Sequence, residues 1–470
     1  MTYVCLEGEE IVQNNINLEH PDYRAKKAMW RKYKDLYTGG EQLRNHAAEY
    51  LMQRQKEGED VYVERLQRVF YENYIGSIID WYSATLFRRE PVLHLDGPDE
   101  GARKFFSQFS EDCDRKGTNL SDFFRRQIVD ALVYGSSYHI LDFPKVSIHA
   151  ETRAEEDKAG TSRAYLLECS PEAVINWATD ENGNYEWVVL RNSYLKGDAD
   201  TKSWNEETRW VYYNRTHYRV FTTRGDKQEI VEVDAGLHGM AKQHRVPLFE
   251  MKLPEGLWLM NRAGLIQLEH FNKSNALSWA LTMGLFAQPV IFSERDFKQM
   301  VGESYYIQLG KDDRFGWTEP EGKVYQIAAD NLVRLKDEIY RVCYLLSQAG
   351  AVTGNGTSQS GISKLRDFAV AQEVLRAYGD TIKDGMKRVL RAVAQARMDE
   401  LTIDVSGLDD FDISDFSDDL ADARTLLQIG IESPTLKRQI FKRLAYKYLC
   451  DVRQEVKDQI AQEIDASLSL

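Results

Sequence analysis

The sequence predicts a mainly helical α+β protein built from several structural regions. With 470 residues and 43% apolar residues, the chain is too long for one compact domain but has enough apolar side chains for sizeable cores. Several long segments repeat apolar residues with a helical period. Residues 163–235 differ, because they are rich in Val, Tyr, Trp and Thr, which favour strands.

The N-terminal part is expected to be helical and to begin with a turn. Gly39-Gly40 is a turn signal that precedes the first helix. Pro91 restricts the residue before it and marks the end of the second helix. Ser121 is the expected N-cap of the last helix in this part. The predicted helices cover residues 41–56, 61–87, 101–110 and 120–134.

The middle of the chain is expected to form a small β-sheet region. Residues 138–141 predict a strand, four further strand-like stretches follow within 163–235, and Asn182-Gly183 is a favourable hairpin turn. His139 on the first of these strands is more typical of a core residue than of a metal ligand. Exposed aromatic side chains can stack on single-stranded bases, but packing within the β-region is the favoured interpretation for Trp204, Trp210, Tyr212, Tyr213, Tyr218 and Phe221.

The C-terminal half returns to long helices separated by a short β-rich insertion. We expect two or three terminal helices after an acidic stretch. The predicted order is a helix at 260–286, a β-rich insertion at 289–329 with strands that include 324–329, a helix at 330–349, a Gly/Ser-rich break at 350–361, a helix at 362–400, an acidic linker at 404–420 and terminal helices within 418–467.

The helix at 330–349 carries a seam of apolar side chains with alternating spacings of three and four residues. This spacing is typical of helices that pack lengthwise against a partner helix. The seam residues are Leu332, Leu335, Ile339, Val342 and Leu346. A similar seam runs along the helix at 362–400, formed by Leu365, Phe368, Leu375, Ile382, Met386, Val389 and Val393.

Charge and cysteine content exclude several classes of protein. The formal net charge of −14 argues against tight, sequence-reading DNA binding but allows a surface past which DNA slides. The five cysteines are scattered, odd in number and without a CxxC pair, which indicates a reducing compartment and neither a disulfide framework nor a zinc site. We expect neither a membrane span nor a secretory signal.

No pattern in the sequence predicts a catalytic residue, a metal ligand or a cofactor. Glycines 354, 356 and 361 miss the spacing of a nucleotide-binding loop, and no GK[ST] follows them. The carboxylates at 409–419 do not fit an EF-hand and are expected to be a solvated linker. A metal-dependent nuclease that uses these carboxylates is the alternative interpretation.

Several short segments, taken in order, resemble the portal proteins of tailed bacteriophages. A GG-containing turn, a Tyr-Leu pair, an aromatic-rich helix and an F-R-R-x-P ending follow one another, and a Pro-Glu-Ala-Val-Ile-Asn-Trp segment then precedes a hairpin. The residues concerned are Trp30, Tyr37-Thr38-Gly39-Gly40, Tyr50-Leu51, Tyr62, Arg65-Leu66, Asn73, Leu86-Phe87-Arg88-Arg89-Glu90-Pro91, Ser170-Pro171-Glu172-Ala173-Val174-Ile175-Asn176-Trp177, Gly183, Val246-Pro247-Leu248 and Phe271-Asn272.

The resemblance implies a portal fold that is mainly helical, with wing, stem, clip and crown regions around a central channel. It spans roughly residues 25–465. The implied regions are an N-terminal wing (1–257, with its β-rich segment at 163–235), a first stem helix (258–288), a clip (289–329), a second stem helix (330–349), a tunnel loop (350–361), a long wing helix (362–403) and a C-terminal helical crown (404–470).

The resemblance also implies a function, partners and a location. Twelve copies would form a ring at one capsid vertex, through which double-stranded DNA is packaged and ejected without sequence specificity. The implied partners are the large terminase, the major capsid protein with its scaffold, and a neck or adaptor protein. The ring would belong to the virion and would assemble in the host cytoplasm. A different head–neck adaptor, which would lack the paired stem helices around a β-insertion, is a further possibility.

The tunnel loop would face this DNA. Its glycines permit unusual backbone angles, and its neutral polar side chains can hydrogen-bond phosphates without the grip of a cation. Lys364 adds a local attraction just after the loop. The loop residues concerned are Gly354, Asn355, Gly356, Thr357, Ser358 and Gln359. A plain interhelical linker is the alternative interpretation.

Overall fold

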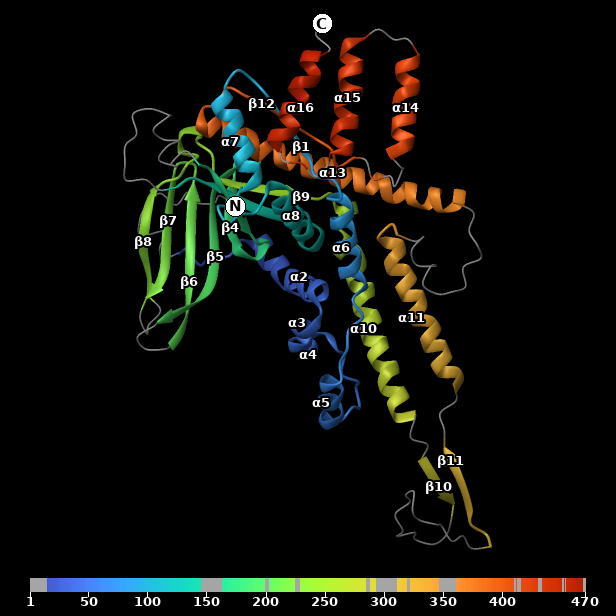
Figure 1. The fold of residues 1–470 in the computed structure, drawn as a ribbon. Helices are drawn as coiled ribbons and strands as arrows, with labels where there is room; N and C mark the ends of the chain where they lie inside the picture. Colours follow the sequence, from blue (N-terminus) through green and yellow to red (C-terminus); the bar gives the residue numbers. More distant parts are fainter. Residues whose placement is uncertain are drawn as a thin grey trace. The chain divides into compact units, whose positions relative to one another are not determined.

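A computed structural model confirms the mainly helical α+β fold (Figure 1). The chain divides into two compact units. Unit 1 contains residues 1–34, 79–260 and 368–470, and unit 2 contains residues 35–78 and 261–367. The structure describes residues 15–144, 163–198, 203–224, 229–284, 288–292, 311–318, 322–345, 361–409, 411, 416–429, 433–449, 452 and 454–467.

The helices near the N-terminus are shorter than expected. Gly39 and Gly40 both have positive φ, 60° and 54°, which confirms the predicted turn after α2 (Pro21–Thr38). The single helix predicted at 41–56 was wrong, because α3 (Gly40–Asn45) and α4 (Ala47–Tyr50) are followed by a loop. The helix predicted at 61–87 was also wrong, since the chain leaves the helical path between α5 (Glu59–Gln67) and α6 (Tyr74–Leu86).

Helices α7 (Glu100–Glu111) and α8 (Leu120–Tyr134) confirm the two predicted helices of this part of unit 1. The predicted N-cap of α8 was wrong. Asn119 has an extended backbone, and its side-chain oxygen accepts the N–H of Asp122 at 2.6 Å, which makes Asn119 the cap. Ser121 already lies inside the helix, so its hydroxyl cannot fill this role.

Helix α8 packs on a three-stranded antiparallel sheet with the order β3-β2-β9, formed by β3 (Tyr165–Cys169), β2 (Ser136–Asp142) and β9 (Leu248–Lys252). His139 of β2 is buried, as expected for a core residue, and its ring lies between those of Phe124 and Phe249, with centroids 5.6 and 5.7 Å away. Burial lowers the pKa of His139 to about 3, so the imidazole is neutral in the fold.

A five-stranded antiparallel sheet confirms the predicted β-region (Figure 1). The Asn182-Gly183 turn joins its first two strands, and Gly183 has a φ of 80°. Most of the aromatic side chains pack as expected, but Trp204 is exposed, which corrects that part of the prediction. The strands, in sheet order, are β4 (Val174–Thr179), β5 (Tyr185–Asp198), β6 (Ser203–Asn214), β7 (His217–Arg224) and β8 (Glu229–Leu237).

The long helix expected at 362–400 is α13 (Gly361–Arg397), and its seam from Leu375 to Val393 is buried in unit 1. The acidic segment after it is not entirely a linker. Its start forms β12 (Thr402–Ser406), which pairs antiparallel with β1 (Val92–Asp96). Ile403 and Val405 alternate inward, and the same period-two pattern leaves the intervening Asp404 exposed to solvent.

Three terminal helices follow in unit 1, which confirms the upper end of the predicted number. They are α14 (Phe416–Gln428), α15 (Pro434–Tyr448) and α16 (Gln454–Ser467). Helix α15 contacts both of the others, and α16 contacts α7 and β1. Short 3₁₀ turns occur at Pro171–Ala173, Ala241–Gln243 and Glu255–Leu257.

Candidate functional site

Unit 2 contains a helix–strand pair–helix arm in the part of the chain for which the family resemblance implied a stem and a clip. The arm consists of α10 (Leu259–Gly284), β10 (Gln288–Phe292), β11 (Arg314–Thr318) and α11 (Gly322–Val342). Helix α10 confirms the helix predicted at 260–286. The prediction that the stretch 324–329 is a strand was wrong, because it forms the first turns of α11, which begins eight residues before the predicted 330.

Three side-chain bridges show that α10 and α11 run antiparallel. Arg262 Nε donates to the carbonyl of Val342 at 3.0 Å, and Lys273 Nζ donates to Asn331 Oδ1 at 3.1 Å. Eleven residues separate the two donors, and eleven separate their acceptors. The Tyr325 hydroxyl donates to the carbonyl of Ala280 at 3.3 Å and continues the same register.

The strand pair continues this register beyond the helices. Gln288 of β10 lies opposite Thr318 of β11, and Phe292 lies opposite Arg314. The two strands therefore pair antiparallel in line with the helix pair, and Figure 1 shows them at the end of α10 and at the start of α11. A two-stranded ribbon is only marginally stable by itself, so the helices are expected to hold it in place.

The predicted seam of α11 is only partly buried. Leu335 and Ile339 are buried, whereas Leu332 and Val342 are half-buried. Leu346 lies outside the described residues. No observation tests whether this seam packs on another stem helix, so that role stays a prediction.

Large apolar side chains are exposed along the whole arm. Val324 and Ile327 of α11 are each at least 60% exposed, although apolar side chains of this size normally find cover. The other exposed members of this set, called the arm patch below, are Leu265 and Leu281 of α10, Phe292 of β10, Phe315 of β11 and Val333 of α11.

Charged side chains on the arm helices are partly paired within each helix. Lys273 binds Glu269 at 3.0 Å, and Arg341 binds Glu338 at 2.6 Å. The hydrogen bond from Arg341 holds the pKa of Glu338 below its usual range. Pairs of this kind at the surface contribute little stability, but they leave the arm without a strong excess of either charge.

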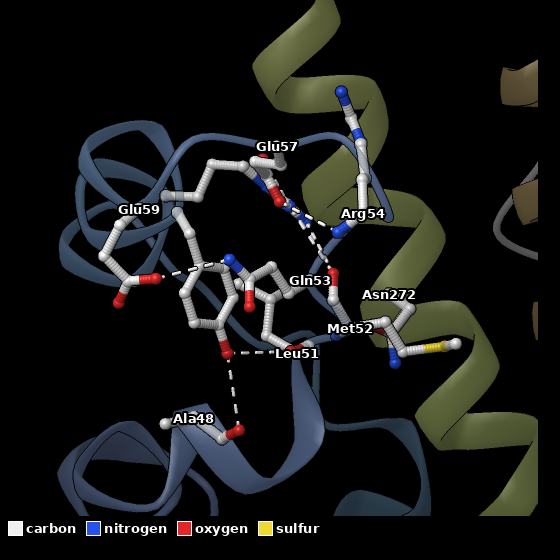
Figure 2. Close-up of polar contacts among 10 residues, drawn as sticks. Ala48, Leu51, Met52, Gln53, Arg54, Glu57, Glu59 and Asn272 are labelled. Atoms are coloured by element: carbon white, nitrogen blue, oxygen red, sulfur yellow. Dashed lines mark hydrogen bonds and ion pairs between the residues drawn. The ribbon is translucent and has the colours of Figure 1, made fainter.

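Three carboxamide side chains fasten α10 to the segment 50–75. Asn272 donates to the carbonyl of Tyr50 at 3.0 Å. It also accepts the N–H of Met52 at 2.9 Å, and Figure 2 labels these two residues. Asn275 both donates to and accepts from the backbone of Phe70, at 2.9 and 3.1 Å. Each side chain therefore satisfies one backbone acceptor and one backbone donor.

The third carboxamide explains why α6 begins at Tyr74. Gln267 Oε1 accepts the N–H groups of Tyr74 and Ile75, both at 3.2 Å, and its Nε2 donates to the carbonyl of Glu72 at 2.8 Å. The first N–H groups of a helix have no partner within that helix. Gln267 supplies this cap from α10, so the break between α5 and α6 depends on a residue almost two hundred positions away.

A buried histidine lies beside this cap. His270 is buried on α10, its Nε2 is 3.4 Å from Glu72 Oε2, and its ring meets that of Tyr74 edge-on at 5.1 Å. Burial lowers the pKa of His270, although Glu72 opposes the shift. The imidazole is therefore neutral at pH 7, and the apolar contact with Tyr74 does not bury a charge.

A buried ion pair shapes the loop between α4 and α5. Arg65 Nη1 lies 2.8 and 2.6 Å from the two carboxylate oxygens of Glu57, and the N–H of Arg54 donates to the same carboxylate at 3.0 Å (Figure 2). Burial alone would raise the pKa of Glu57, but the donors from Arg54 and Arg65 lower it below its usual range. The loop is thus held in one shape, although Met52 at its surface is exposed.

Sequence patterns could not have identified these carboxamides as anchors. Gln267, Phe271 and Asn275 lie on one helical face at i, i+4 spacing, but a hydrophobic pattern counts the two amides as solvent-facing positions. The only signal was the Phe271-Asn272 pair, which entered through the family resemblance. The structure adds the physical reason for Asn272, which is backbone recognition.

Other predicted site residues lie wholly or partly outside the described residues. The loop residues Gly354, Asn355, Gly356, Thr357, Ser358 and Gln359 lie outside the described residues, as do Asp410, Asp412 and Asp415 of the acidic segment. Lys364 lies in the first turn of α13, but its side chain is outside the described part. In the described part of the chain, no His, Cys, Asp and Glu side chains gather in threes so as to hold a metal ion, and no helix is long and apolar enough to cross a bilayer.

The chain is similar to chains of gene transfer agent (GTA) particles among solved structures. A chain from the neck of an empty GTA particle computed with C6 symmetry is 13% identical, with 78% of this chain and 90% of that chain covered and a TM-score of 0.42. A chain from the virion of a native GTA particle is 12% identical (84% and 96% covered, TM-score 0.41), and one from the neck of a native particle computed with C12 symmetry is 13% identical (84% and 97% covered, TM-score 0.39). No protein-family model and no curated protein matches the chain.

Proposed function

We propose that the chain is a portal subunit of a tailed phage or phage-like particle. Twelve copies form a ring at one capsid vertex, and double-stranded DNA passes through its channel without sequence recognition. The observation that carries the proposal is the arm of unit 2, in which two antiparallel helices joined through a strand pair expose the arm patch to solvent. Such a surface is expected to be covered by a partner, and a closed ring of copies covers it on every subunit.

The lengths of the arm helices suit a channel wall. Helix α10 has 26 residues and α11 has 21, which correspond to about 39 and 32 Å at 1.5 Å per residue. The order of the elements also follows the family resemblance, from helix, strand pair and helix to the 37-residue α13 and the terminal helices. The net charge of −14 favours a wall past which DNA slides.

The remaining partners follow from the same proposal. The ring nucleates head assembly with the major capsid protein and scaffold, docks the large terminase during packaging, and later binds a neck or adaptor protein. The subunit needs no catalytic activity or cofactor of its own, because the terminase supplies the energy. The protein belongs to the portal vertex of the virion and assembles in the host cytoplasm.

Electron microscopy and mass photometry of the purified protein test the ring directly. We expect rings with a central hole and a mass near twelve times that of the chain. The double variant Val324→Asp/Ile327→Asp is expected to keep the circular dichroism spectrum of the wild type but to lose the rings, because it places two charges in the contact between copies. The variant Gln326→Asp adds one charge on the same exposed stretch and serves as the control that keeps its rings. Normal rings from the double variant would contradict the proposal.

The seam of α11 gives a second test of the same arm. Leu335→Asp and Ile339→Asp each bury a charge and are expected to block ring assembly. Because both residues are buried within the subunit, the spectrum and melting of unassembled protein must be compared alongside. Closed rings from either variant would contradict the stem assignment.

The tunnel loop is tested by deletion of residues 354–359. The ring is expected to remain intact, whereas DNA packaging or retention is impaired, because the loop touches the moving duplex. Normal DNA filling would contradict the loop assignment. The rival nuclease function is tested on the same preparations, with Mg²⁺ and linear duplex DNA, and cleavage that disappears in Asp410→Ala would favour the nuclease.

A further inference from the structure

Half of the large apolar side chains that the structure describes on the three terminal helices are exposed, and the other half are only partly buried. Among the side chains that the structure describes on α14, α15 and α16, the buried ones are Ala423 and Lys457. Helix α8 in the same unit, with only 15 residues, buries both of its phenylalanines together with Ile128 and Leu132. The exposed fractions on the terminal helices range from 37% to 67%, for Leu420, Leu426, Leu436, Phe441, Tyr448 and Val456, and Ile429 just after α14 is 62% exposed.

Helices of this length do not persist without a covered apolar face. Isolated helices of fewer than about 12–15 residues are marginal in water, and in proteins tertiary packing supplies most of their stability. Helix α14 has 13 residues, α15 has 15 and α16 has 14. Among the described residues, their mutual contacts leave the apolar side chains above in solvent, and such a surface is expected to be covered by a partner.

The charges of the three helices alternate in sign along the chain. The sequence of α15 contains five cations and no anion, whereas α14 contains three Asp with one Arg, and α16 contains four acids with one Lys. Lys442 of α15 binds Asp465 of α16 at 2.7 Å, so opposite charges already meet within one subunit. Arg443 is exposed and forms no ion pair with any residue that the structure describes.

We propose that α14–α16 form a self-association surface of their own, occupied by the same three helices of a neighbouring copy. A layer in which a basic helix lies between two acidic ones is self-complementary, because a shifted copy places α15 beside α14 or α16 of the next. The apolar side chains then cover one another. This inference rests on the proposed ring only for the number of copies and adds a contact separate from the arm patch.

The charges also argue against duplex DNA, the other ligand that the basic helix α15 would attract. A polyanion such as duplex DNA is attracted by five cations on one helix, but the acidic helices on both sides repel it. A second copy presents both signs and avoids this repulsion. DNA binding is therefore treated as an outcome that would overturn the proposal.

Dilution of assembled protein tests the contact. In Leu426→Ser/Phe441→Ser, two exposed apolar side chains on α14 and α15 become polar, so the subunit fold is expected to survive. Mass photometry should show that this variant dissociates at a subunit concentration at least about tenfold higher than the wild type. Val233→Ser/Leu237→Ser removes two exposed apolar side chains from β8 and is the control expected to behave as wild type.

The charge contribution is tested by Arg443→Glu. It should shift dissociation in the same direction at low salt, and the shift should shrink at high salt, because screening weakens exposed charges. In the ring-deficient Val324→Asp/Ile327→Asp protein, residual small oligomers are expected, and Phe441→Ser should abolish them. This experiment distinguishes the contact between terminal helices from the assembly of the ring.

Three outcomes would overturn the proposal. The first is unchanged dissociation in Leu426→Ser/Phe441→Ser, which leaves the ring proposal standing if the rings are normal. The second is the absence of residual oligomers in the ring-deficient protein. The third is binding of a 30-base-pair duplex that Arg443→Glu abolishes while dissociation is unaltered, which would assign the surface to a polyanion.

Discussion

The two long helices α10 and α13 are held in their units by different kinds of contact. In unit 1, α13 buries an apolar seam that includes Leu375, Ile382 and Val389. In unit 2, the buried side of α10 is largely polar, and Gln267 and Asn275 reach the backbone of the segment 50–75. One helix is positioned by apolar burial, and the other by hydrogen bonds of fixed direction.

This difference teaches what each helix tolerates. Apolar burial is not directional, so a helix such as α13 accepts substitutions that conserve volume. A carboxamide that satisfies backbone groups must keep its donor and its acceptor in place, because a buried group without a partner is costly. We therefore expect α13 to be sensitive to side-chain size and α10 to be sensitive to side-chain chemistry.

The largest effect is expected from a cavity in the seam of α13. Ile382→Ala removes a fully buried side chain and should lower the free energy of unfolding of unit 1 by about 2–5 kcal/mol. Leu375→Met conserves volume and should cost less than about 1.5 kcal/mol. Chemical denaturation of both variants measures the difference, and equal losses would contradict the view that size governs this helix.

Gln267→Leu tests the opposite behaviour on α10 with a side chain of similar size. The substitution leaves the N–H groups of Tyr74 and Ile75 and the carbonyl of Glu72 without their partner, at about 1–3 kcal/mol for each group that stays buried. Hydrogen exchange should accelerate at residues 72–76. The exposed Gln326 of α11 provides the control, since Gln326→Leu should leave exchange there unchanged. Unaltered exchange in Gln267→Leu would show that α6 does not need this cap.

The same contrast explains how much of the fold could be predicted from the sequence. The seam of α13 repeats with a helical period, and the helix was placed within three residues at its end. Helix α10 was found because it is long, apolar in part and free of proline. The break between α5 and α6 was missed because Gln267, which caps α6, is remote in the sequence and resembles a surface residue.

The other misses have similar local causes. The β12 strand was hidden by acidic residues, although Ile403 and Val405 alternate as a strand requires. The first turns of α11 were taken for a strand because Val324, Tyr325 and Ile327 have high β-propensity, and the helix context overrides it. Of the candidate site, the seam residues Leu335 and Ile339 were correctly placed on a helix, while the tunnel loop lies outside the described residues.

Acidification should weaken unit 2 through the ion pair of Glu57 and Arg65. The pKa of Glu57 is lowered in the fold from the ordinary 4.5. A lowered carboxyl pKa stabilises the fold above the unfolded value, and this contribution is lost as pH falls through the folded value. Hydrogen exchange at residues 51–65 should therefore accelerate below about pH 4.5. In Glu57→Gln this acid-dependent step should be absent, and an unchanged step there would assign it to another group.

The smallest expected effect concerns the start of α8. The buried face of this helix is mainly apolar, but its first turn depends on a directional hydrogen bond. Asn119→Ala removes the acceptor for the Asp122 N–H and should lower the free energy of unfolding by about 1 kcal/mol. Ser121→Ala, two residues later, should change the free energy of unfolding by less than about 0.5 kcal/mol. Ser121 lies within the first turn of α8, and the alanine that replaces it has a high helix propensity. Thermal melts of the two variants, measured side by side, show which of the two residues caps the helix. If Ser121→Ala costs more, the cap is at Ser121 and α8 begins later. If Asn119→Ala costs more, a single side-chain oxygen fixes the start of a helix whose buried face is mainly apolar, as Gln267 does for α6 from a distance.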